Sequence, residues 1–533
     1  MSMSKRKSLR MSVIVNNPIL PSDCIEEILK SLDKDRSSLY SWTLVNRSWC
    51  QYAIALLWSH PFTSLNLSDD QDTGHLLIRT YLTCLSSEAR QALEAEGHVL
   101  PNSKPLFDYP SYFKELHIGS LQNALEQWWT KNTDYRLRKK ANFTTLESLI
   151  FEMLINKSNG LRLLHCESRS RYNMTDCTSF TGIQKAVTRI QELRINCSSV
   201  DQGQLTNLLS TIIENSHQIH RLVLTPHHEG TMAQKVPKLI EAQQCLEQFS
   251  MISSLAGLFN PSRSASIFSA LTSQIKSLTH ADFRKIYFDE NSLQILAKCH
   301  NLKSLYLVNC HQEQDITLSD SLLKSGQLSI TKLVLNHDHH NSVKDGLSQN
   351  TCTSIIMMSA QTLQELSIDY INSDLVQILS TQIPHLTSFS IRTTPISQLE
   401  WISTSTLTHL ALSDVGPNSS IAPLKHIGQL LPPTLTHLQL ECRYNIAPES
   451  MAGMLDDCQT QLKILSLDVE KIDDTLLEVV ADYSRENGKC VRELRIAKDT
   501  RLQFDQRLCK KLQSVIPSIN LNYVDPWPLL IGE

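Results

Sequence analysis

The chain has 533 residues, of which 41% are hydrophobic and 20% are charged, and its formal net charge at pH 7 is -4. This length allows two to four ordinary domains, or one small domain joined to a long repeat array. With only 15 glycines and 19 prolines, the composition excludes a collagen-like fibre and wholesale disorder. A weakly acidic chain offers no global attraction to nucleic acid or anionic lipid, so neither is an expected partner.

The 14 cysteines are scattered along the chain and form no CxxC pair. This pattern is typical of reduced thiols, so we expect the protein in the cytoplasm, the nucleus or both. The apolar run near the N-terminus is too short for the core of a signal peptide. No stretch approaches the roughly 20 apolar residues that a spanning helix needs, so we expect no membrane association.

The segment from Leu20 to Phe62 predicts three short helices. In the first, Asp23 can act as the N-cap, and apolar residues follow at positions i, i+3, i+4 and i+7, namely Ile25, Ile28, Leu29 and Leu32. A second helix is expected after the polar break that ends at Arg36, and a third ends before Pro61. Three short helices cannot bury all their apolar faces among themselves, so part of this surface should dock on a partner or on the rest of the chain.

The same segment carries an LP pair, an acidic residue two places on, an IL pair, then LVNRSW and a closing LW. In this order and spacing, the landmarks resemble the F-box family. The resemblance implies a three-helix fold that docks on a Skp-type adaptor and, through it, on a cullin ubiquitin ligase. Carried over by position, it assigns the adaptor contact to Leu20, Pro21, Ile25, Ile28, Leu29, Leu44, Val45 and Trp49. Cys24 replaces the more usual Ile or Leu, a mild change because Cys behaves as a small hydrophobe.

A second pattern recurs along the rest of the chain: an apolar residue, two variable residues, an apolar residue, one variable residue and another apolar residue. Copies begin at Phe113, Leu146, Ile190, Ile219, Phe283, Leu302, Ile330, Leu363, Leu386, Leu407, Leu435, Leu462 and Val491, with a weaker copy at Leu246. From Leu302 onward they start between 21 residues (Leu386 to Leu407) and 33 residues (Ile330 to Leu363) apart, mostly within the range of leucine-rich repeats. The second and third apolar residues of each copy share one side of a strand and should fill the interior of a solenoid.

This body resembles the irregular leucine-rich repeats that follow F-boxes, especially in fungal proteins. We therefore predict an α/β fold, in which a short N-terminal three-helix F-box precedes a leucine-rich-repeat solenoid with a curved parallel sheet and outer helices. The predicted parts are a flexible tail (1–18), the F-box (19–62), a connecting helical region (63–112), the solenoid (113–520) and a C-terminal tail (521–533). The usual turn asparagine is mostly missing, so the register between residues 146 and 283 stays open. A large α/β domain with unrelated strands is the structural alternative.

Residues next to the inward positions are predicted to face outward on the concave side of the sheet. Their charges are mixed and aromatic residues are few, which favours a protein partner over a phosphate backbone. The predicted substrate-binding residues are Arg194, Arg221, Tyr306, Lys332, His409, His437 and Arg495. Each of them, taken alone, can equally be an ordinary solvated strand residue.

Two histidine clusters invite a metal-site interpretation: NHDHH, with His337, His339 and His340, and the pair His227 and His228. Neither has a recognised ligand spacing or a cysteine close by, so we expect no metal site there. Cys299 and Cys310 each precede a histidine and are interpreted as small core residues. The chain contains no P-loop, dinucleotide-binding glycine motif, GxSxG or HExxH, so we expect no catalytic residues and no cofactor.

Two functional hypotheses remain, beside an enzyme that no motif supports. In the first, the chain is the substrate receptor of an SCF-type ubiquitin ligase: the F-box binds the adaptor, the repeats bind a target protein, and other subunits perform the chemistry. In the second, it is a non-ligase leucine-rich-repeat scaffold whose F-box-like helices cap the solenoid. A receptor must leave an apolar stripe of the helices accessible, whereas a cap must bury it.

Overall fold

The structure is a computed structural model, and it describes residues 21–31, 35–62, 73–132, 142–167, 176–180, 182–196, 202–225, 232–253, 261–316, 328–336, 346–392, 398–413, 424–442, 445–485, 491–497, 501–503, 512–513 and 515–523. The chain forms two compact units. Unit 1 comprises Met1–Leu163, Arg169–Arg171 and Ser179–Ala186, and unit 2 comprises Leu164–Ser168, Tyr172–Thr178 and Val187–Glu533. Among the described helices, none is both long enough and apolar enough to cross a bilayer.

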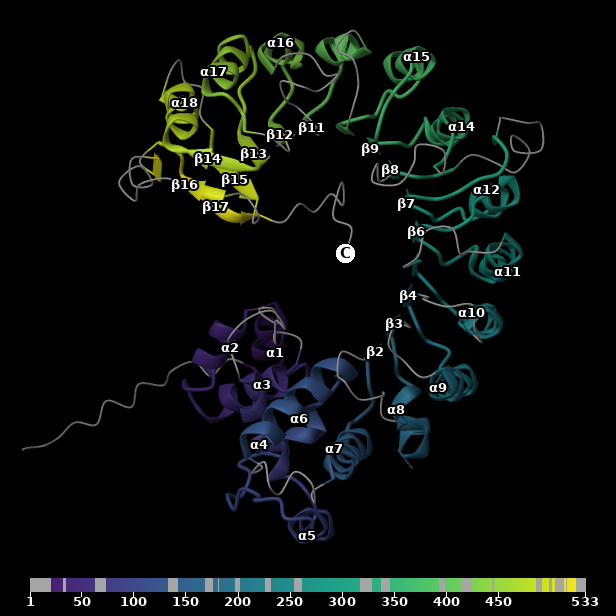
Figure 1. Cartoon of the computed structure of the whole chain (residues 1–533), viewed down its shortest axis with the longest axis vertical. Helices are drawn as coiled ribbons and strands as arrows, with labels where there is room; N and C mark the ends of the chain where they lie inside the picture. Colours follow the sequence, from purple (N-terminus) through teal and green to yellow (C-terminus); the bar gives the residue numbers. More distant parts are fainter. Residues whose placement is uncertain are drawn as a thin grey trace, which may run out of the picture. The chain divides into compact units, whose positions relative to one another are not determined.

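Unit 1 is mainly helical (Figure 1). Its helices are α1 (Ser22–Ser31), α2 (Arg36–Trp42), α3 (Arg47–Leu57), α4 (Gly74–Leu82), α5 (Ser87–Ala95), η1 (Tyr109–Tyr112), α6 (Ile118–Asn132) and α7 (Phe143–Lys157), with α8 (Ile183–Val187) at its boundary. The first three are the short helices expected from the sequence. Side chains cap the N-termini of two of them. Asp35 accepts from the backbone N–H of Ser38 at the start of α2, and Asn46 accepts from the backbone N–H of Trp49 at the start of α3.

Helices α1 to α3 pack around a small apolar cluster of their own. Ile25 and Leu29 of α1 are buried against Leu39 of α2. Partly buried side chains surround these three, and they are Trp42, Trp49, Tyr52, Leu56 and Leu57. One stripe of the amphipathic helix α1 therefore faces the inside of this three-helix bundle.

A parallel sheet runs through the repeat body. In the described part of the chain its 15 strands follow one another in sequence order, without a crossover. They are β1 (Glu115–His117), β2 (Leu163–Cys166), β3 (Glu192–Asn196), β4 (Arg221–Thr225), β5 (Gln248–Ile252), β6 (His280–Arg284), β7 (Ser304–Val308), β8 (Lys332–Asn336), β9 (Glu365–Ile368), β10 (Ser388–Ile391), β11 (His409–Leu412), β12 (His437–Cys442), β13 (Ile464–Val469), β15 (Glu493–Ala497) and β17 (Ser518–Tyr523). A separate pair, β14 (Lys471–Asp473) and β16 (Arg501–Gln503), is also parallel.

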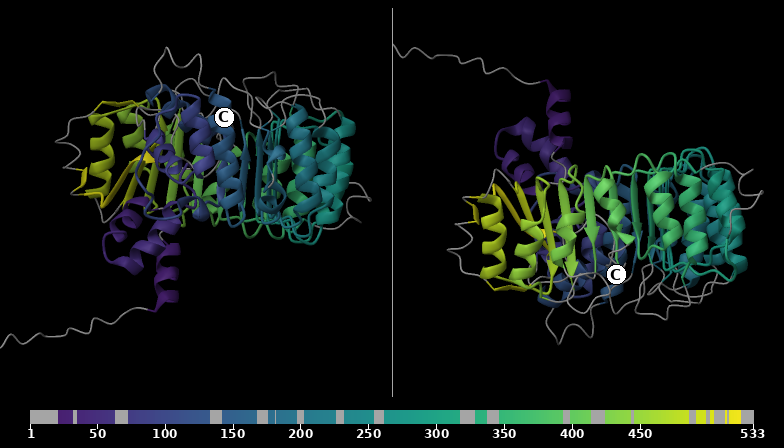
Figure 2. Two further views of the ribbon diagram at one scale, coloured as in Figure 1. Left: turned by 90° about the horizontal axis from the view of Figure 1, so that it is seen from below. Right: turned by 90° about the horizontal axis from the view of Figure 1, so that it is seen from above.

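Helical segments separate the strands of unit 2 and lie on the outer side of its curved sheet (Figure 1). Figure 2 shows the longer ones side by side along the unit. They are η2 (Cys177–Ser179), α9 (Gln202–Asn215), α10 (Met232–Glu241), α11 (Pro261–Leu271), η4 (Thr272–Gln274), α12 (Glu290–Ala297), α14 (Gln349–Ser359), α15 (Ser373–Thr381), η6 (Glu400–Thr404), α16 (Leu424–Ile427), η7 (Gly428–Leu430), α17 (Pro448–Asp456) and α18 (Asp474–Arg485). The predicted α/β solenoid of leucine-rich-repeat type, a curved parallel sheet with outer helices, is thus confirmed.

Apolar side chains stack in rows between the sheet and these helices. The register pairs Leu305 of β7 with Leu333 of β8, and Leu333 with Leu366 of β9. All three are fully buried, as are the corresponding residues of the other strands from β3 to β15. Each repeat therefore buries its apolar face only by stacking on its neighbours.

The same backbone contact joins consecutive strands wherever the pairing is regular. On the β11 and β12 strands, for example, the N–H groups of Thr436 and His437 both donate to the carbonyl oxygen of Thr408, at 2.9 and 3.0 Å. The Thr436 hydroxyl donates to the same oxygen at 3.1 Å. This contact fixes the register, so side chains at equivalent positions line up across the sheet.

Two buried glutamines hydrogen-bond backbone groups of adjacent repeats in part of unit 2. The Gln243 side chain accepts from the Ile219 N–H at 3.0 Å and donates to the carbonyl oxygens of Ser216 and Leu239. One repeat later, the side-chain amide of Gln274 also bonds the backbone of the preceding repeat, since it donates to the Gln243 carbonyl oxygen at 2.8 Å. These amides satisfy backbone groups that would otherwise be buried without a partner.

Two of the predicted strand positions are wrong. The copy at Leu146 lies in helix α7, where Leu146, Ile150 and Leu154 recur at helical spacing and are buried. The copy at Phe283 is displaced, because the strand is β6 (His280–Arg284) and its inward residues are Ala281 and Phe283. Within the 15-stranded sheet, β2 and β17 had no predicted copy.

The corrected register of β6 predicts unequal effects of one substitution at adjacent residues. Ala281 is fully buried and His280 is exposed. Ala281→Glu should lower the free energy of unfolding by about 3 kcal/mol or more, because it buries a charge without a partner. His280→Glu should change it by less than about 1 kcal/mol. The measurement is urea-induced unfolding of both variants, and equal losses would contradict the register.

Candidate functional site

The outward face of the unit 2 sheet carries all seven predicted substrate-binding residues. Each lies on a strand whose alternating pattern directs its apolar neighbours inward, as in ELRI of β15, where Leu494 and Ile496 are buried. The seven are Arg194 on β3, Arg221 on β4, Tyr306 on β7, Lys332 on β8, His409 on β11, His437 on β12 and Arg495 on β15. They form separate groups along the sheet.

The first group is built around one carboxylate. Arg194 donates from Nε to Glu192 Oε1 at 2.6 Å, and Arg221 Nη1 lies 3.5 Å from the same oxygen. Glu192 is directly opposite Arg221 in the register of β3 and β4. Two guanidinium groups therefore share one carboxylate, which leaves a modest positive charge at this end of the face.

The second group pairs Tyr306 with Lys332. The ammonium nitrogen of Lys332 lies 5.9 Å from the centre of the Tyr306 ring, within the range of a cation–π contact, and 3.1 Å from Glu365 Oε2 on the next strand.

At the far end of the sheet, on β15, Arg495 donates to both oxygens of Glu493, at 2.8 and 3.0 Å. Partly exposed ion pairs of this kind contribute at most about 1 kcal/mol each. These cations can therefore exchange their carboxylates for those of a partner at low cost.

The third group is a histidine pair. His409 and His437 lie opposite each other on β11 and β12, with ring centres 5.3 Å apart, and His437 Nε2 lies 2.9 Å from Ser466 Oγ. The pKa of His437 is lowered to about 4, mainly by burial, with His409 and Arg495 contributing to the shift and Glu493 opposing it. Burial also lowers the pKa of His409. Both rings are therefore neutral at pH 7.

The structure separates the eight predicted adaptor residues into two classes. Pro21 is exposed, and so are Ile28 (39% of its surface), Leu44 (75%) and Val45 (59%). In contrast, Ile25 and Leu29 lie in the core of the three-helix bundle, and Trp49 is half-buried against Trp42. Leu20 lies outside the described residues.

An additional exposed aromatic residue, Tyr40, accompanies Leu44 and Val45. Tyr40 is on α2 with 64% of its surface exposed, and Leu44 and Val45 lie in the turn that links α2 to α3. Tyr40 was not among the predicted adaptor residues. The outward apolar surface of the bundle therefore comprises Ile28, Tyr40, Leu44 and Val45.

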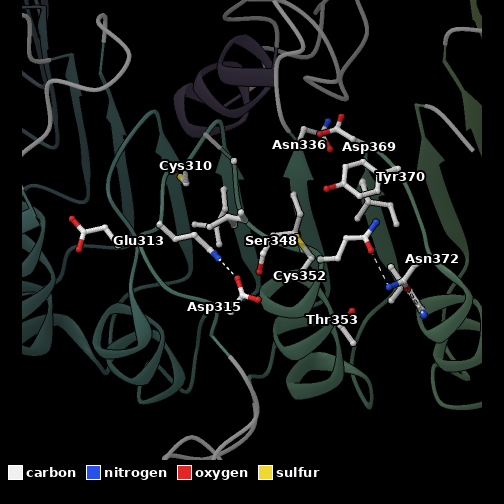
Figure 3. Close-up of a pocket in the computed structure, with 18 residues that line it drawn as sticks. Cys310, Glu313, Asp315, Asn336, Ser348, Cys352, Thr353, Asp369, Tyr370 and Asn372 are labelled. Carbon is white, nitrogen blue, oxygen red and sulfur yellow. Dashed lines mark hydrogen bonds between the residues drawn. The ribbon is translucent and has the colours of Figure 1, made fainter. Parts of the chain in front are cut away.

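A cavity of about 340 Å³ lies where strands β7, β8 and β9 end beside the start of helix α14 (Figure 3). Its apolar wall includes Leu307, Leu335 and Ile368, and its polar wall includes Asp315 and Asp369. Asp315 accepts hydrogen bonds from Gln312 Nε2 at 3.1 Å and Asn350 Nδ2 at 2.9 Å.

The described lining of this cavity contains three acidic residues, Glu313, Asp315 and Asp369, and no basic one. Arg392 Nη1 lies 4.0 Å from Asp369 Oδ1, so it offsets one of the three charges. An apolar wall beside carboxylates suits a side chain with an aliphatic stem and a cationic head. The chemistry of the cavity therefore matches a lysine or arginine side chain better than an anion.

Cys299 and Cys310, which each precede a histidine in the sequence, are buried. Burial raises the pKa of the Cys299 thiol to about 11 and that of Cys310 to about 12, and the Cys310 thiol donates to the Phe283 carbonyl oxygen at 3.3 Å. Protonated, buried thiols are poor nucleophiles and poor metal ligands. The histidine clusters at 227–228 and 337–340 lie outside the described residues.

These features define the class of the molecule: a leucine-rich-repeat type α/β solenoid that follows a helical N-terminal unit. No protein-family model matches the chain, and no curated protein matches it. Among solved structures, the chain is similar to the crystal structure of the Rad7 and Elc1 complex in yeast, with a TM-score of 0.37 and 13% sequence identity, over 68% of this chain and 82% of that one. A likeness this distant leaves the function to be argued from the residues of the chain itself.

The pKa of His437 predicts a pH-dependent stability. A histidine whose pKa is lower in the folded protein stabilises the fold above its unfolded pKa of about 6.5, and this stability is lost as the pH falls toward the folded value, about 4. From pH 7 to pH 5 the parent should lose about 1–2 kcal/mol of unfolding free energy more than His437→Gln, which cannot titrate. Urea unfolding at both pH values measures this difference, and parallel pH dependences would contradict the assignment.

Proposed function

We propose that the chain is the substrate-recognition subunit of an SCF-type ubiquitin ligase. In this proposal the N-terminal helices bind a Skp-type adaptor, which connects the chain to a cullin, and the outward face of the repeats binds a target protein. The observation that carries the proposal is the exposure of Ile28, Leu44 and Val45 on a bundle whose core is filled by other residues.

The adaptor contact is assigned to the outward apolar surface of the bundle, beginning near Pro21. Fully burying an exposed Leu or Val side chain contributes about 1.5–3 kcal/mol, so a few such residues account for a stable docking site. Ile25 and Leu29 support it indirectly, because they pack against Leu39 and hold α1 in place. The proposal thus gives the exposed residues the direct contact and gives Ile25 and Leu29 a supporting role.

The target contact is assigned to the outward face from β3 to β15. Its charged residues are paired within the face, and the aromatic and arginine residues that dominate protein interfaces occur at Tyr306, Arg221 and Arg495. Small side chains lie in the middle of this face, because Ser367 of β9 pairs with Ser390 of β10, and larger ones such as Tyr306 of β7 and Gln439 of β12 lie on either side. Such a mosaic supports recognition of a folded or extended protein more than of a phosphate backbone.

No catalytic role is proposed for this chain. Tethering a target close to the catalytic subunits raises its effective concentration, and binding alone achieves this. The raised pKa values of the buried thiols Cys299, Cys310 and Cys352 fit a chain without a cysteine nucleophile among them.

The alternative is a leucine-rich-repeat scaffold outside any ligase, with the N-terminal helices as a cap. That alternative requires Ile28 to be buried by the chain's own repeats, along with Ile25 and Leu29. Ile28 lies outside the bundle core of Ile25, Leu29 and Leu39, so it is available for a contact, and adaptor binding distinguishes the two accounts.

Charged substitutions on the outward apolar surface test the proposal. The double variant Leu44→Asp, Val45→Asp should weaken adaptor binding at least about 30-fold, because two apolar contacts are replaced by desolvated charges. The bundle core is untouched, so the variant should keep the circular dichroism and unfolding midpoint of the parent. Binding is measured by co-purification with the Skp-type adaptor and by titration calorimetry.

The matched control is Val99→Asp, Leu106→Asp, which introduces the same charges at apolar residues that are 75% and 81% exposed elsewhere in unit 1. It should bind the adaptor like the parent. If the folded parent does not bind the adaptor at all, the scaffold becomes the better account. If both double variants bind equally well, the contact does not lie at Leu44 and Val45.

A further inference from the structure

His220 lies directly before strand β4, and Glu247 lies directly before strand β5. They face each other across the sheet, because Arg221 pairs with Gln248 in the register of the two strands. The N–H groups of Glu247 and Gln248 both donate to the His220 carbonyl oxygen, at 2.9 and 2.8 Å. The two backbones are thus held at fixed separation, and the His220 and Glu247 side chains begin from neighbouring points at the sheet edge.

Cys245 joins them from the same segment as Glu247. Leu246, between the two, is fully buried, whereas Cys245 and Glu247 are exposed. Alternation along an extended segment thus directs the thiol and the carboxylate to the same side. A ring nitrogen of His220, the Cys245 Sγ and a carboxylate oxygen of Glu247 all lie within 4.8 Å of one another.

We propose that His220, Cys245 and Glu247 form a zinc site at this edge of the repeat body. Imidazole, thiolate and carboxylate are the three side-chain ligand types that Zn²⁺ uses, and three protein ligands leave the fourth tetrahedral position to water. With one thiolate and one carboxylate, a bound Zn²⁺ has its charge fully balanced. The combination of a soft and a borderline donor favours Zn²⁺ over Mg²⁺ or Ca²⁺, which take oxygen ligands.

Only small side-chain movements are needed to close the site. Bonds of about 2.0–2.3 Å place tetrahedral donors roughly 3.3–3.8 Å apart, about 1 Å closer than the outer limit of the present spacing. Exposed Cys and Glu side chains can make this change by rotamer adjustment while the backbone stays fixed. The bound ion would link β4 to β5 and so reinforce their pairing.

The sequence analysis did not find this trio, because His220 lies 25 residues before Cys245 and no family of short metal motifs has this spacing. Only the register of β4 and β5 brings the three together. The inference is independent of the proposed ligase function, since it concerns a different edge of the repeats and needs neither adaptor nor target.

Alkylation of the full-length chain tests the site directly. The thiol of Cys245 is exposed, and so is that of Cys24 in helix α1, which serves as an internal control. With Zn²⁺ added, alkylation of Cys245 by iodoacetamide, followed by mass spectrometry, should slow by about tenfold or more, because the metal-bound thiolate is no longer free. Alkylation of Cys24 should keep its rate.

His220→Ala and Glu247→Gln should each remove most of this protection, measured in each variant as the ratio of its alkylation rates without and with Zn²⁺. Co²⁺ should also give the near-ultraviolet absorption of a thiolate-bound ion in the parent, and lose it in Cys245→Ser. These substitutions lie at the surface, and circular dichroism verifies that the fold is kept. Equal alkylation rates of Cys245 with and without Zn²⁺, or full protection in His220→Ala, would overturn the proposal.

Discussion

The repeated backbone contact between consecutive strands is the constraint on which the rest of the repeat body depends. At each regular step, two adjacent N–H groups donate to one carbonyl oxygen of the preceding strand, as Lys332 and Thr331 do to Lys303. This contact permits one register only. The apolar residues are then forced into continuous buried rows, and the residues beside them are forced outward in rows of their own. The fold and the arrangement of the outward face are two consequences of the same hydrogen bonds.

On this outward face, ion pairs form between residues that are distant in the sequence. Glu192 meets Arg221 and Lys332 meets Glu365 because the register places them on neighbouring strands. The effect is a surface with many charges but little net field, which favours a partner that matches the pattern over one that is merely oppositely charged. The helical N-terminal unit follows a different rule, since its apolar surface is left over after a small core has been filled.

The sequence predicted the solenoid because the apolar pattern is repeated many times, and it failed where one position of the pattern is occupied by an unusual residue. Cys166 in β2 and Ala281 in β6 take inward positions, and neither was recognised as such. In α7 the same pattern fits a helix, because apolar spacings of three and five residues occur in both structures when the window is short. The adaptor residues show a different limit. Periodicity places Ile25 and Leu29 on one stripe of α1, but it cannot tell whether that stripe faces the bundle core or a partner.

The functional residues are the least predictable part for a physical reason. A catalytic motif is local, because its residues must be held within a few ångströms by one turn or helix, and its sequence spacing is therefore recognisable. A solenoid assembles its sites from adjacent repeats, whose separation in sequence drifts while their separation in space stays constant. His409 and His437 are 5.3 Å apart between ring centres although they are 28 residues apart in the sequence. Once the register is known, such neighbours can be deduced along every row, and binding chemistry in this protein is therefore best sought across strands and not along them.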